Sequence, residues 1–287
     1  QFHINIDLMK ILIIGLSGCF GTEFKKVCKK KKIQFFGYRS SVLNILDQKN
    51  LEKKIKLIKP NFILNCSAVV GINQCEDNYQ NAFGINTVGP LNLAKLCKKY
   101  KITLIQTSTH AIFDGEKNSS YSEKDLPKPN NIYSGSKYLS ELFVSSICEK
   151  YYIIRFPTLF GQRNNKLLGF VDKVYNGLKQ NKKLKIATDK IDSPTYAKDA
   201  AEALFFLIKN KKKYGTYHLA NAGKVSFYEF VLYLKKLLKS KSKIVPVKDS
   251  HFPSIGFKPL KTSIVSTKIK KLRNWKIALK EYVKTVS

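Results

Sequence analysis

The feature that most constrains the fold is a series of short, continuously apolar segments that alternate with longer amphipathic segments. Apolar runs of this length, separated by helical patterns, are typical of βαβ units, whose parallel strands are buried on both faces. The sequence therefore predicts an α/β fold with a Rossmann-type doubly wound parallel sheet. The predicted strands are Met9–Ile14, Ile33–Tyr38, Asn61–Ser67, Ile102–Thr107 and Tyr152–Phe156.

The alternation of apolar runs and helical segments becomes less regular after Gly161, which predicts a division of the chain into two parts. Residues 9–162 are expected to form the sheet domain, and residues 163–196 and 211–287 a smaller C-terminal α/β lobe, while a helix over 197–210 packs back on the sheet. Met9 is the only methionine, so residues 1–8 are interpreted as an extension outside the fold or a remnant of expression. The other predicted elements are helices Thr22–Lys32, Leu51–Lys59, Asn86–Tyr100, Tyr133–Lys150, Asp199–Lys209 and Phe227–Ser240, a strand Tyr214–Ala220 and a last helix containing Trp275.

The chain carries 52 basic and 20 acidic residues, a formal net charge of +32. Four of the basic residues are arginines, and the lysines are scattered over the whole length. Base readout and bidentate phosphate binding favour arginine, so the charge is interpreted as a compositional bias and no nucleic-acid partner is expected. The positive field is still expected to attract anionic small molecules.

No apolar run approaches the roughly 20 residues that a membrane-spanning helix needs, so no membrane association is expected and a cytoplasmic location is the default. The six cysteines contain no Cys-x-x-Cys pair, so neither a zinc site nor a redox motif is predicted. We expect reduced thiols that serve as small apolar side chains, and no bound metal.

Three evenly spaced glycines follow the first predicted strand, in Gly15-Leu-Ser-Gly18-Cys-Phe-Gly21, and a helix follows them. This arrangement provides a tight turn, close approach to a pyrophosphate, and a helix N-terminus whose free N–H groups favour negative charge. It predicts that the sheet domain binds a dinucleotide, with a purely structural turn as the alternative. After the second strand the chain has Arg39-Ser40 and no acid, which favours NADPH and leaves NADH open, unless Arg39 is one more solvated base.

A Tyr133-x-x-x-Lys137 pair begins a predicted helix, and its four-residue spacing places both side chains on one face. The ammonium of Lys137 is expected to lower the pKa of Tyr133, which makes the phenol a usable proton donor or acceptor. Upstream, the fourth strand leads into Ser108-Thr109, so a hydroxyl lies at the carboxyl edge of the sheet, where ligands bind in such folds. The order and spacing of these elements predict a single site.

With these motifs the chain resembles the extended short-chain dehydrogenases/reductases, and within that superfamily it is most similar to the dTDP-4-dehydrorhamnose reductases. The similarity extends from Met9 to about Val283. The most subfamily-specific segments are Ser193-Pro-Thr-Tyr-Ala-x-Asp199 and Tyr217-His-Leu-Ala220. Further matching segments are Asn65-Cys-Ser-Ala68, Ser108-Thr109-x-x-Ile-Phe-Asp-Gly115, Arg155-Phe-Pro-Thr-Leu-Phe-Gly161 and Trp275-x-x-Ala-Leu279.

The resemblance implies a role for each matching residue. Thr109 would hydrogen-bond the substrate oxygen, Tyr133 would transfer the proton, and Lys137 would hold the nicotinamide ribose and tune Tyr133. Asp47 would meet the adenine, and Phe156 would lie near the nicotinamide. With the residues chosen above, the predicted cofactor-binding set is Gly15, Gly18, Cys19, Phe20, Gly21, Arg39, Ser40, Asp47, Cys66, Ser67, Ala68, Tyr133, Lys137 and Phe156.

The chain departs from the family at positions that face the sugar. It has His110-Ala111 where the reductases usually have Asp-Tyr, and Thr158 where they have Trp, so another nucleotide-activated deoxysugar or a heptose is a plausible substrate. His110 is either a polar contact or an acid/base group for an epimerisation, because an unperturbed imidazole has a pKa of about 6.5. The epimerising reductases have a Cys shortly after the catalytic hydroxyl, and Ala111 argues against that step. By resemblance, Asn165 and Thr195 are further candidate substrate contacts.

The expected function is an NADPH-dependent reductase of a 4-keto nucleotide sugar in the synthesis of surface polysaccharides. Its partner is then a nucleotide-diphosphate sugar, bound by the C-terminal lobe. The oligomeric state stays open, with a homodimer as one candidate because dimers are common for this fold. Two alternatives stay open, namely a sugar-nucleotide 4-epimerase or dehydratase on the same scaffold, and a non-catalytic subunit that binds NADP. Dehydratases usually have an acidic pair beside the threonine, which His110-Ala111 does not supply. The complete set of Thr109, Tyr133 and Lys137 argues against a non-catalytic subunit.

Overall fold

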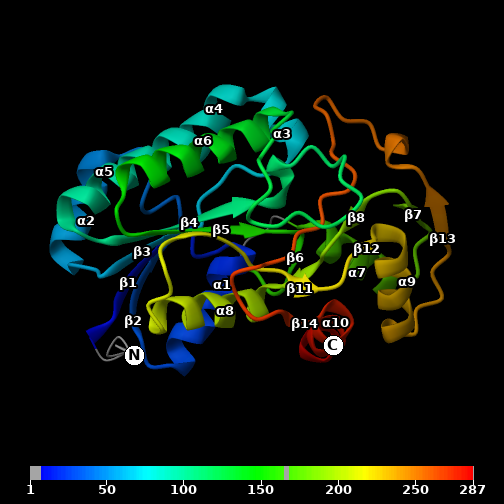
Figure 1. Cartoon of the computed structure of the whole chain (residues 1–287). Helices are drawn as coiled ribbons and strands as arrows, with labels where there is room; N and C mark the ends of the chain where they lie inside the picture. Colours follow the sequence, from blue (N-terminus) through cyan, green and yellow to red (C-terminus); the bar gives the residue numbers. More distant parts are fainter. Residues whose placement is uncertain (1–7, 165–167, 287) are drawn as a thin grey trace.

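The computed structural model describes residues 8–164 and 168–286, and in these residues a six-stranded sheet forms the centre of the molecule (Figure 1). Its strand order is β10-β5-β4-β3-β1-β2, and every neighbouring pair is parallel. The prediction of a Rossmann-type doubly wound sheet is therefore confirmed. The strands are β1 (Lys10–Ile14), β2 (Gln34–Tyr38), β3 (Phe62–Asn65), β4 (Thr103–Thr109), β5 (Tyr151–Phe156) and β10 (Gly215–His218).

Helices cover both faces of the sheet (Figure 1). On one face α1 (Cys19–Lys30) and α8 (Ala197–Lys209) share a buried apolar cluster with the strands, and the cluster includes Phe24, Ile154 and Leu204. On the other face lie α2 (Gln48–Ile58), α5 (Gly89–Tyr100) and α6 (Ile132–Ile147), whose cluster includes Leu12, Ile153 and Val144. Burial on both faces explains why the strands have continuously apolar sequences.

The segment before α5 differs from the predicted helix Asn86–Tyr100. The structure starts the helix earlier, with a π-helical turn, η2 (Gly84–Val88), and Pro90 lies in the first turn of α5. A proline has no N–H to donate and its ring crowds the preceding turn, so a wider turn at this point is a physical way to continue the helix. Two short helices precede it that the sequence analysis did not predict, α3 (Ile72–Asp77) and α4 (Tyr79–Phe83).

The C-terminal lobe has its own core. α7 (Phe170–Lys179), α9 (Phe227–Leu238) and α10 (Trp275–Val286) enclose a cluster that includes Phe230, Trp275 and Tyr282. The remaining elements are η3 (His110–Ile112), η4 (Asp249–His251), β6 (Leu159–Phe160), β7 (Leu184–Ala187), β8 (Ile191–Asp192), β9 (Thr195–Tyr196), β11 (Asn221–Ala222), β12 (Val225–Ser226), β13 (Ile244–Val247) and β14 (Leu272–Asn274). β13 pairs with β7 and β9 with β6 in parallel, whereas β12 pairs with β8 antiparallel.

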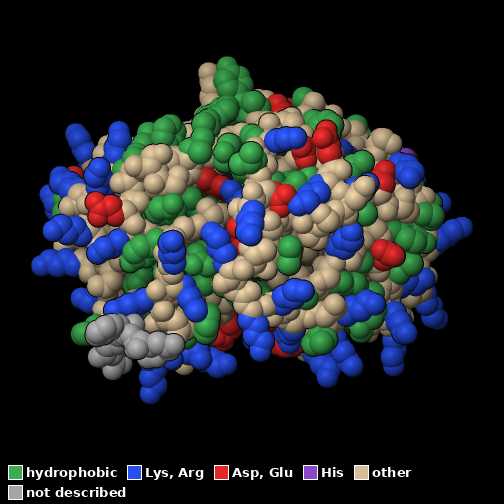
Figure 2. Space-filling view, viewed as in Figure 1, with side chains coloured by type: hydrophobic (Ala, Val, Ile, Leu, Met, Phe, Trp, Pro, Cys, Tyr) green, Lys and Arg blue, Asp and Glu red, His purple; other side chains and the backbone are tan. Residues whose placement is uncertain are grey.

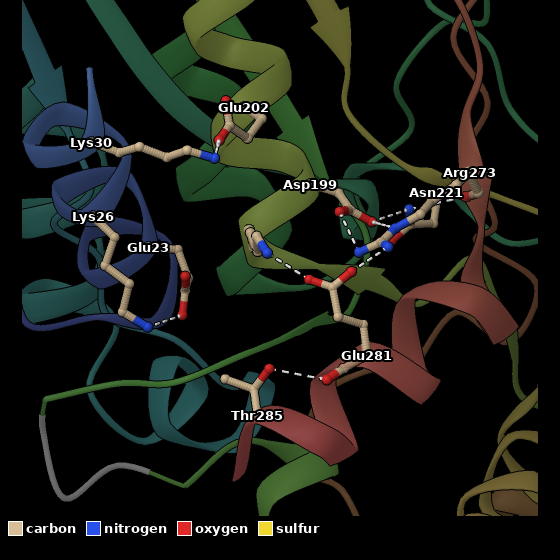
Figure 3. A network of polar contacts seen from close by, with 10 residues as sticks. Glu23, Lys26, Lys30, Asp199, Glu202, Asn221, Arg273, Glu281 and Thr285 are labelled. Carbon is tan, nitrogen blue, oxygen red and sulfur yellow. Dashed lines mark hydrogen bonds and ion pairs between the residues drawn. The ribbon is translucent and has the colours of Figure 1, made fainter.

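A polar network ties α8 to this lobe (Figure 3). Arg273 of β14 donates to both carboxylate oxygens of Asp199 at 2.8 Å and to Glu281 of α10 at 2.5 Å. Asn221 also donates to Asp199, at 2.8 Å. Because α8 lies against the sheet, these bonds connect the lobe to the sheet domain at the first turn of one helix. The division at residue 162 stays a prediction.

The residue before β1, Met9, is fully buried, whereas the side chain of Leu8 is 71% exposed. Residues 1–7, most of the predicted extension, lie outside the described residues. Among the helices of the described residues, none combines the length and the apolar character needed to cross a membrane. All six cysteines are free thiols, and five of them are buried.

Candidate active site

The glycine loop lies where the sheet reverses its winding direction. β1 is followed through α1 by β2 on one side and pairs with β3 on the other, and ligands bind in α/β sheets at such a switch point. Gly15 has φ +80°, and a Cβ added to it would lie 2.7 Å from main-chain atoms of Cys66 and Ser67. Both the backbone angle and the approach of β3 therefore require glycine at position 15.

The reason for a glycine at position 18 is different. Gly18 is the N-cap of α1 with φ −68°, and an added Cβ would meet nothing closer than the Gly15 carbonyl oxygen at 3.6 Å. Neither its backbone angle nor its neighbours therefore require glycine. A missing side chain at this position leaves room at the N-terminus of α1, where the first N–H groups of a helix have no partner within it. This arrangement is suited to bind a phosphate.

One cavity of about 490 Å³ joins the glycine loop to the Tyr–Lys pair. The hydroxyls of Ser67 and Ser108, both in its wall, are buried and have no hydrogen-bond partner among the described residues. Unsatisfied hydroxyls beside a glycine cradle fit a dinucleotide, which brings polar groups of its own. Of the predicted residues, the lining includes Gly15, Gly18, Cys19, Phe20, Gly21, Ser40, Cys66, Ser67, Ala68, Thr109, Tyr133, Lys137 and Phe156.

Two predicted cofactor residues are not part of this lining. Asp47 is the N-cap of α2 and its carboxylate accepts a hydrogen bond from the amide of Asn50 at 3.0 Å. Its structural position is thus that of a helix cap, and Asn44 and Ile45 line the cavity instead. Arg39 is exposed on the loop after β2, next to Ser40, which does line the cavity. Asn44 and Ile45 were not predicted, because no local pattern distinguishes them.

The structure brings Thr109 and Tyr133 together. Thr109 is the last residue of β4, and Tyr133 lies in the first turn of α6. Both side chains line the same cavity, and Thr109 Oγ1 accepts a hydrogen bond from the amide of Ala111 at 3.1 Å. Burial raises the pKa of Tyr133 to about 12, although the neighbouring Thr109 side chain opposes that shift. At neutral pH the phenol therefore carries its proton.

Lys137 does not act on Tyr133 as predicted. Its Nζ donates to the carbonyl oxygen of Thr107 at 2.7 Å, and its ammonium is not among the groups that shift the pKa of Tyr133. Burial lowers the pKa of Lys137 to about 8, and Glu141 opposes this shift. The expectation that the ammonium lowers the tyrosine pKa is wrong in this structure, because burial dominates and the ammonium is bound by a main-chain oxygen.

The candidate substrate residues His110 and Thr158 meet at an aspartate. His110 Nδ1 lies 3.2 Å from Oδ1 of Asp192, and the amide of Thr158 donates to Oδ2 of Asp192 at 2.9 Å. Neither residue is part of the cavity lining described above, although Pro157 and Leu159 are. Asp192 was not predicted, since its contact with His110 joins segments that are far apart in the sequence.

Three further candidates have different positions. Thr195 is fully buried, donates to the carbonyl of Ser193 at 2.9 Å and accepts from the amide of Asn221 at 2.8 Å. Its hydroxyl is used inside the protein, which corrects the prediction that it contacts substrate. Ala111 contributes its amide to Thr109. Asn165 lies outside the described residues.

The cysteine thiols of the cavity wall are protonated at neutral pH, and the described residues contain no candidate metal site. Burial raises the pKa values of the Cys19 and Cys66 thiols, which are in the cavity wall, to about 12, so both are protonated at neutral pH. Within residues 8–164 and 168–286 no group of three or more His, Cys, Asp or Glu side chains is placed to hold a metal ion.

The fold and the site define a class of protein: an extended short-chain dehydrogenase/reductase, with a Rossmann sheet, a glycine loop at the switch point and a Tyr–Lys pair facing the same cavity. Comparison with protein families gives the particular assignment. Residues 9–287 match the model of the RmlD substrate binding domain, and the chain belongs to this family. The predicted family is thus confirmed.

Similar proteins match almost the whole chain. It is 26% identical over 280 residues to the spore coat polysaccharide biosynthesis protein SpsK of Bacillus subtilis, which covers 96% of this chain and 97% of SpsK. A solved dTDP-4-dehydrorhamnose reductase from Clostridium acetobutylicum has a TM-score of 0.91 and 31% identity, over 97% of this chain and 99% of that one. The reductase of Bacillus anthracis, solved in complex with NADP, has a TM-score of 0.91 and 26% identity, over 96% and 99%.

Proposed function

We propose that the protein is an NADPH-dependent reductase of a 4-keto nucleotide sugar in surface-polysaccharide synthesis. The observation that carries the proposal is that Thr109, Tyr133 and Lys137 lie in the wall of the cavity that the glycine loop also lines. The relatives support it, since they include dTDP-4-dehydrorhamnose reductases, a spore coat polysaccharide protein and a structure with bound NADP. We place the enzyme in the cytoplasm, where NADPH is available.

The chain's own residues provide proton transfer and charge stabilisation. When bound, the cofactor supplies the hydride that converts the ketone carbon to an alcohol carbon. The Thr109 hydroxyl is placed to hydrogen-bond the ketone oxygen, and Tyr133, protonated at neutral pH, gives its proton to that oxygen as negative charge develops. Lys137 has a pKa of about 8 and is mostly protonated at neutral pH, and its hydrogen bond to the carbonyl oxygen of Thr107 holds the helix of Tyr133 against the strand of Thr109.

We infer that the nucleotide of the substrate lies toward the C-terminal lobe. A second cavity of about 350 Å³ is lined there by Phe170 and Phe227, whose rings stack at 4.1 Å, and by Lys173, Lys185 and Lys190. Aromatic faces and ammonium groups suit a nucleobase and a diphosphate, respectively. The wall also contains Asp249, an acid that tempers the positive charge.

The experiment that tests the proposal follows NADPH absorbance with purified protein and a panel of 4-keto nucleotide sugars, including dTDP-4-keto-6-deoxy-D-glucose. Net oxidation of NADPH that depends on the sugar is the expected result. Conversion of the sugar without net oxidation would favour the 4-epimerase or dehydratase alternative. Tight NADPH binding without conversion of any sugar would favour the non-catalytic subunit.

We also propose that the enzyme is a homodimer that associates through the outer face of α6. The charged residues of this helix, Lys137 and Glu141, are both buried, and Leu139, Leu142 and Phe143 are exposed. Each other helix of ten or more residues in the described part of the chain has at least one lysine that is exposed or half-buried.

Neighbouring residues extend this apolar face. Tyr79 of α4 is 56% exposed and Val88 of η2 is 44% exposed. Hydrophobic side chains gather over α4 and α6 at the top of the view in Figure 2, while lysines cover much of the remaining visible surface. Two copies that each carry +32 repel one another, so they approach best where lysine is missing, whereas an acidic partner would be drawn to the lysine-covered surface.

A further inference from the structure

His110 has one ring nitrogen fixed and the other free to bind. Its Nδ1 lies 3.2 Å from Oδ1 of Asp192 and 3.0 Å from the carbonyl oxygen of Thr262. Both partners are acceptors, so Nδ1 carries the proton and donates. Nε2 makes no hydrogen bond with any described residue, and the side chain is 14% exposed. In this tautomer Nε2 is a hydrogen-bond acceptor for which the described residues supply no donor.

Asp192 is held in place to orient the ring. Its side chain is 2% exposed, and it accepts hydrogen bonds from the amides of Thr158 at 2.9 Å and Ser193 at 2.7 Å. Burial raises the pKa of this carboxyl, but His110 and the Thr158 amide more than offset the effect, so the pKa stays below its ordinary value. A buried carboxylate with main-chain donors is a rigid support for an imidazole.

The pair is next in the chain to residues of both cavities that the proposed substrate would occupy. Thr109, next to His110, is in the wall of the cofactor cavity, and Lys190, two residues before Asp192, is in the wall of the lobe cavity. A nucleotide sugar with its ketone at Thr109 and its nucleotide at Lys190 would extend past the contact between His110 and Asp192. The part of the substrate at this point is the sugar ring beside its reacting carbon.

We propose that His110 is a specificity-determining residue whose Nε2 accepts a hydrogen bond from a sugar hydroxyl near the reacting ketone, and that Asp192 is its positioning residue. The inference rests on the proposed reductase function and specifies its substrate. The enzyme selects 4-keto sugars that retain this hydroxyl over analogues deoxygenated at that carbon, because without the hydroxyl Nε2 is desolvated and left without a donor.

The test asks whether the effect of removing a sugar hydroxyl on kcat/KM depends on the His110 side chain. The sugars are dTDP-4-keto-6-deoxy-D-glucose and its analogues that lack the C2 or the C3 hydroxyl. With the unaltered protein we expect kcat/KM to fall at least about tenfold for one of the two analogues. With His110→Ala all three sugars should have kcat/KM values within about threefold of one another, while the Kd for NADPH changes less than about twofold.

Asp192→Asn tests the positioning role separately. The amide that replaces one carboxylate oxygen faces donors, so the imidazole loses its fixed orientation. We expect the same analogue discrimination to shrink at least about threefold, mainly through KM, in protein whose NADPH Kd is unchanged. A purely structural role would lower activity with all three sugars equally.

Opposite results have distinct meanings. If His110→Ala and the unaltered protein discriminate the analogues equally, or if the unaltered protein discriminates neither analogue, the inference is overturned and the reductase function stands. If the unaltered protein reduces none of the sugars although it binds NADPH, the proposed function fails, and the inference fails with it.

Discussion

Lys137 Nζ donates a hydrogen bond of 2.7 Å to the carbonyl oxygen of Thr107, and both residues are buried. This bond joins the first turns of α6 to the carboxyl end of β4. Because Tyr133 is on the same helix and Thr109 on the same strand, the bond fixes the spacing of the two hydroxyls that act on the substrate oxygen. The buried ammonium thus holds the helix and the strand of the site together.

Lys137→Met is expected to remove a pH dependence of stability. The pKa of Lys137 is lowered by burial from 10.5 to about 8, so between these values the unfolded state binds the proton and the folded state does not. The contribution of this group to the free energy of unfolding therefore rises with pH across that window. Relative to the variant, the unaltered protein should gain on the order of 2 kcal/mol from about pH 8 to about pH 10, measured by urea unfolding without cofactor. An equal pH response in both proteins would contradict this.

Tyr133→Phe is expected to lower kcat by about 10² to 10⁴ because the ketone oxygen loses its proton donor. The Kd for NADPH should change less than about threefold, since the ring remains in the cavity wall. The measurements are sugar-dependent NADPH oxidation and a cofactor titration. Tyr138→Phe, on the same helix and half-buried, is the matched control and should keep full activity. Turnover by Tyr133→Phe at the unaltered rate would refute the assigned role.

Two glycine substitutions should affect different properties, since one lowers cofactor affinity and the other lowers stability. Gly18→Ala adds a Cβ with no contact closer than 3.6 Å, so thermal unfolding should change little, but the Kd for NADPH should rise at least about tenfold because the phosphate loses its space. Gly15→Ala forces a Cβ to 2.7 Å from two main-chain atoms at φ +80°, so it should cost about 3 kcal/mol or more in stability. Unaltered cofactor affinity in a folded Gly18→Ala protein would argue against the phosphate position.

Arg39→Asp is expected to change the cofactor preference. An acid after the second strand suits a ribose hydroxyl, whereas Arg39, exposed beside the cavity residue Ser40, suits the additional phosphate of NADPH. The ratio of kcat/KM for NADPH to that for NADH should fall at least about tenfold. Lys236→Asp, an equal charge change on the exposed face of α9, should leave the ratio unchanged. If both variants gave the same ratio, Arg39 would be an ordinary surface charge.

Leu142→Lys should convert a dimer to a monomer in sedimentation equilibrium, because it places a charge in the centre of the apolar face of α6, where Leu142 is 42% exposed. Leu57→Lys on α2 is the control, since Leu57 is 74% exposed and lies away from that face. The control should remain dimeric. A monomer for the unaltered protein, or a dimer that survives Leu142→Lys, would exclude this interface.

The sequence by itself determined the sheet, the glycine loop and the Tyr133–Lys137 pair, because each depends on local order. Apolar runs predict buried parallel strands, and a four-residue spacing places two side chains on one helix face whatever surrounds them. Only the tertiary structure decided the partners of these groups. It bound Lys137 to Thr107, made Asp47 a helix cap and placed Asp192 beside His110. Such choices depend on burial and on contacts between segments far apart in the chain, which no local periodicity records.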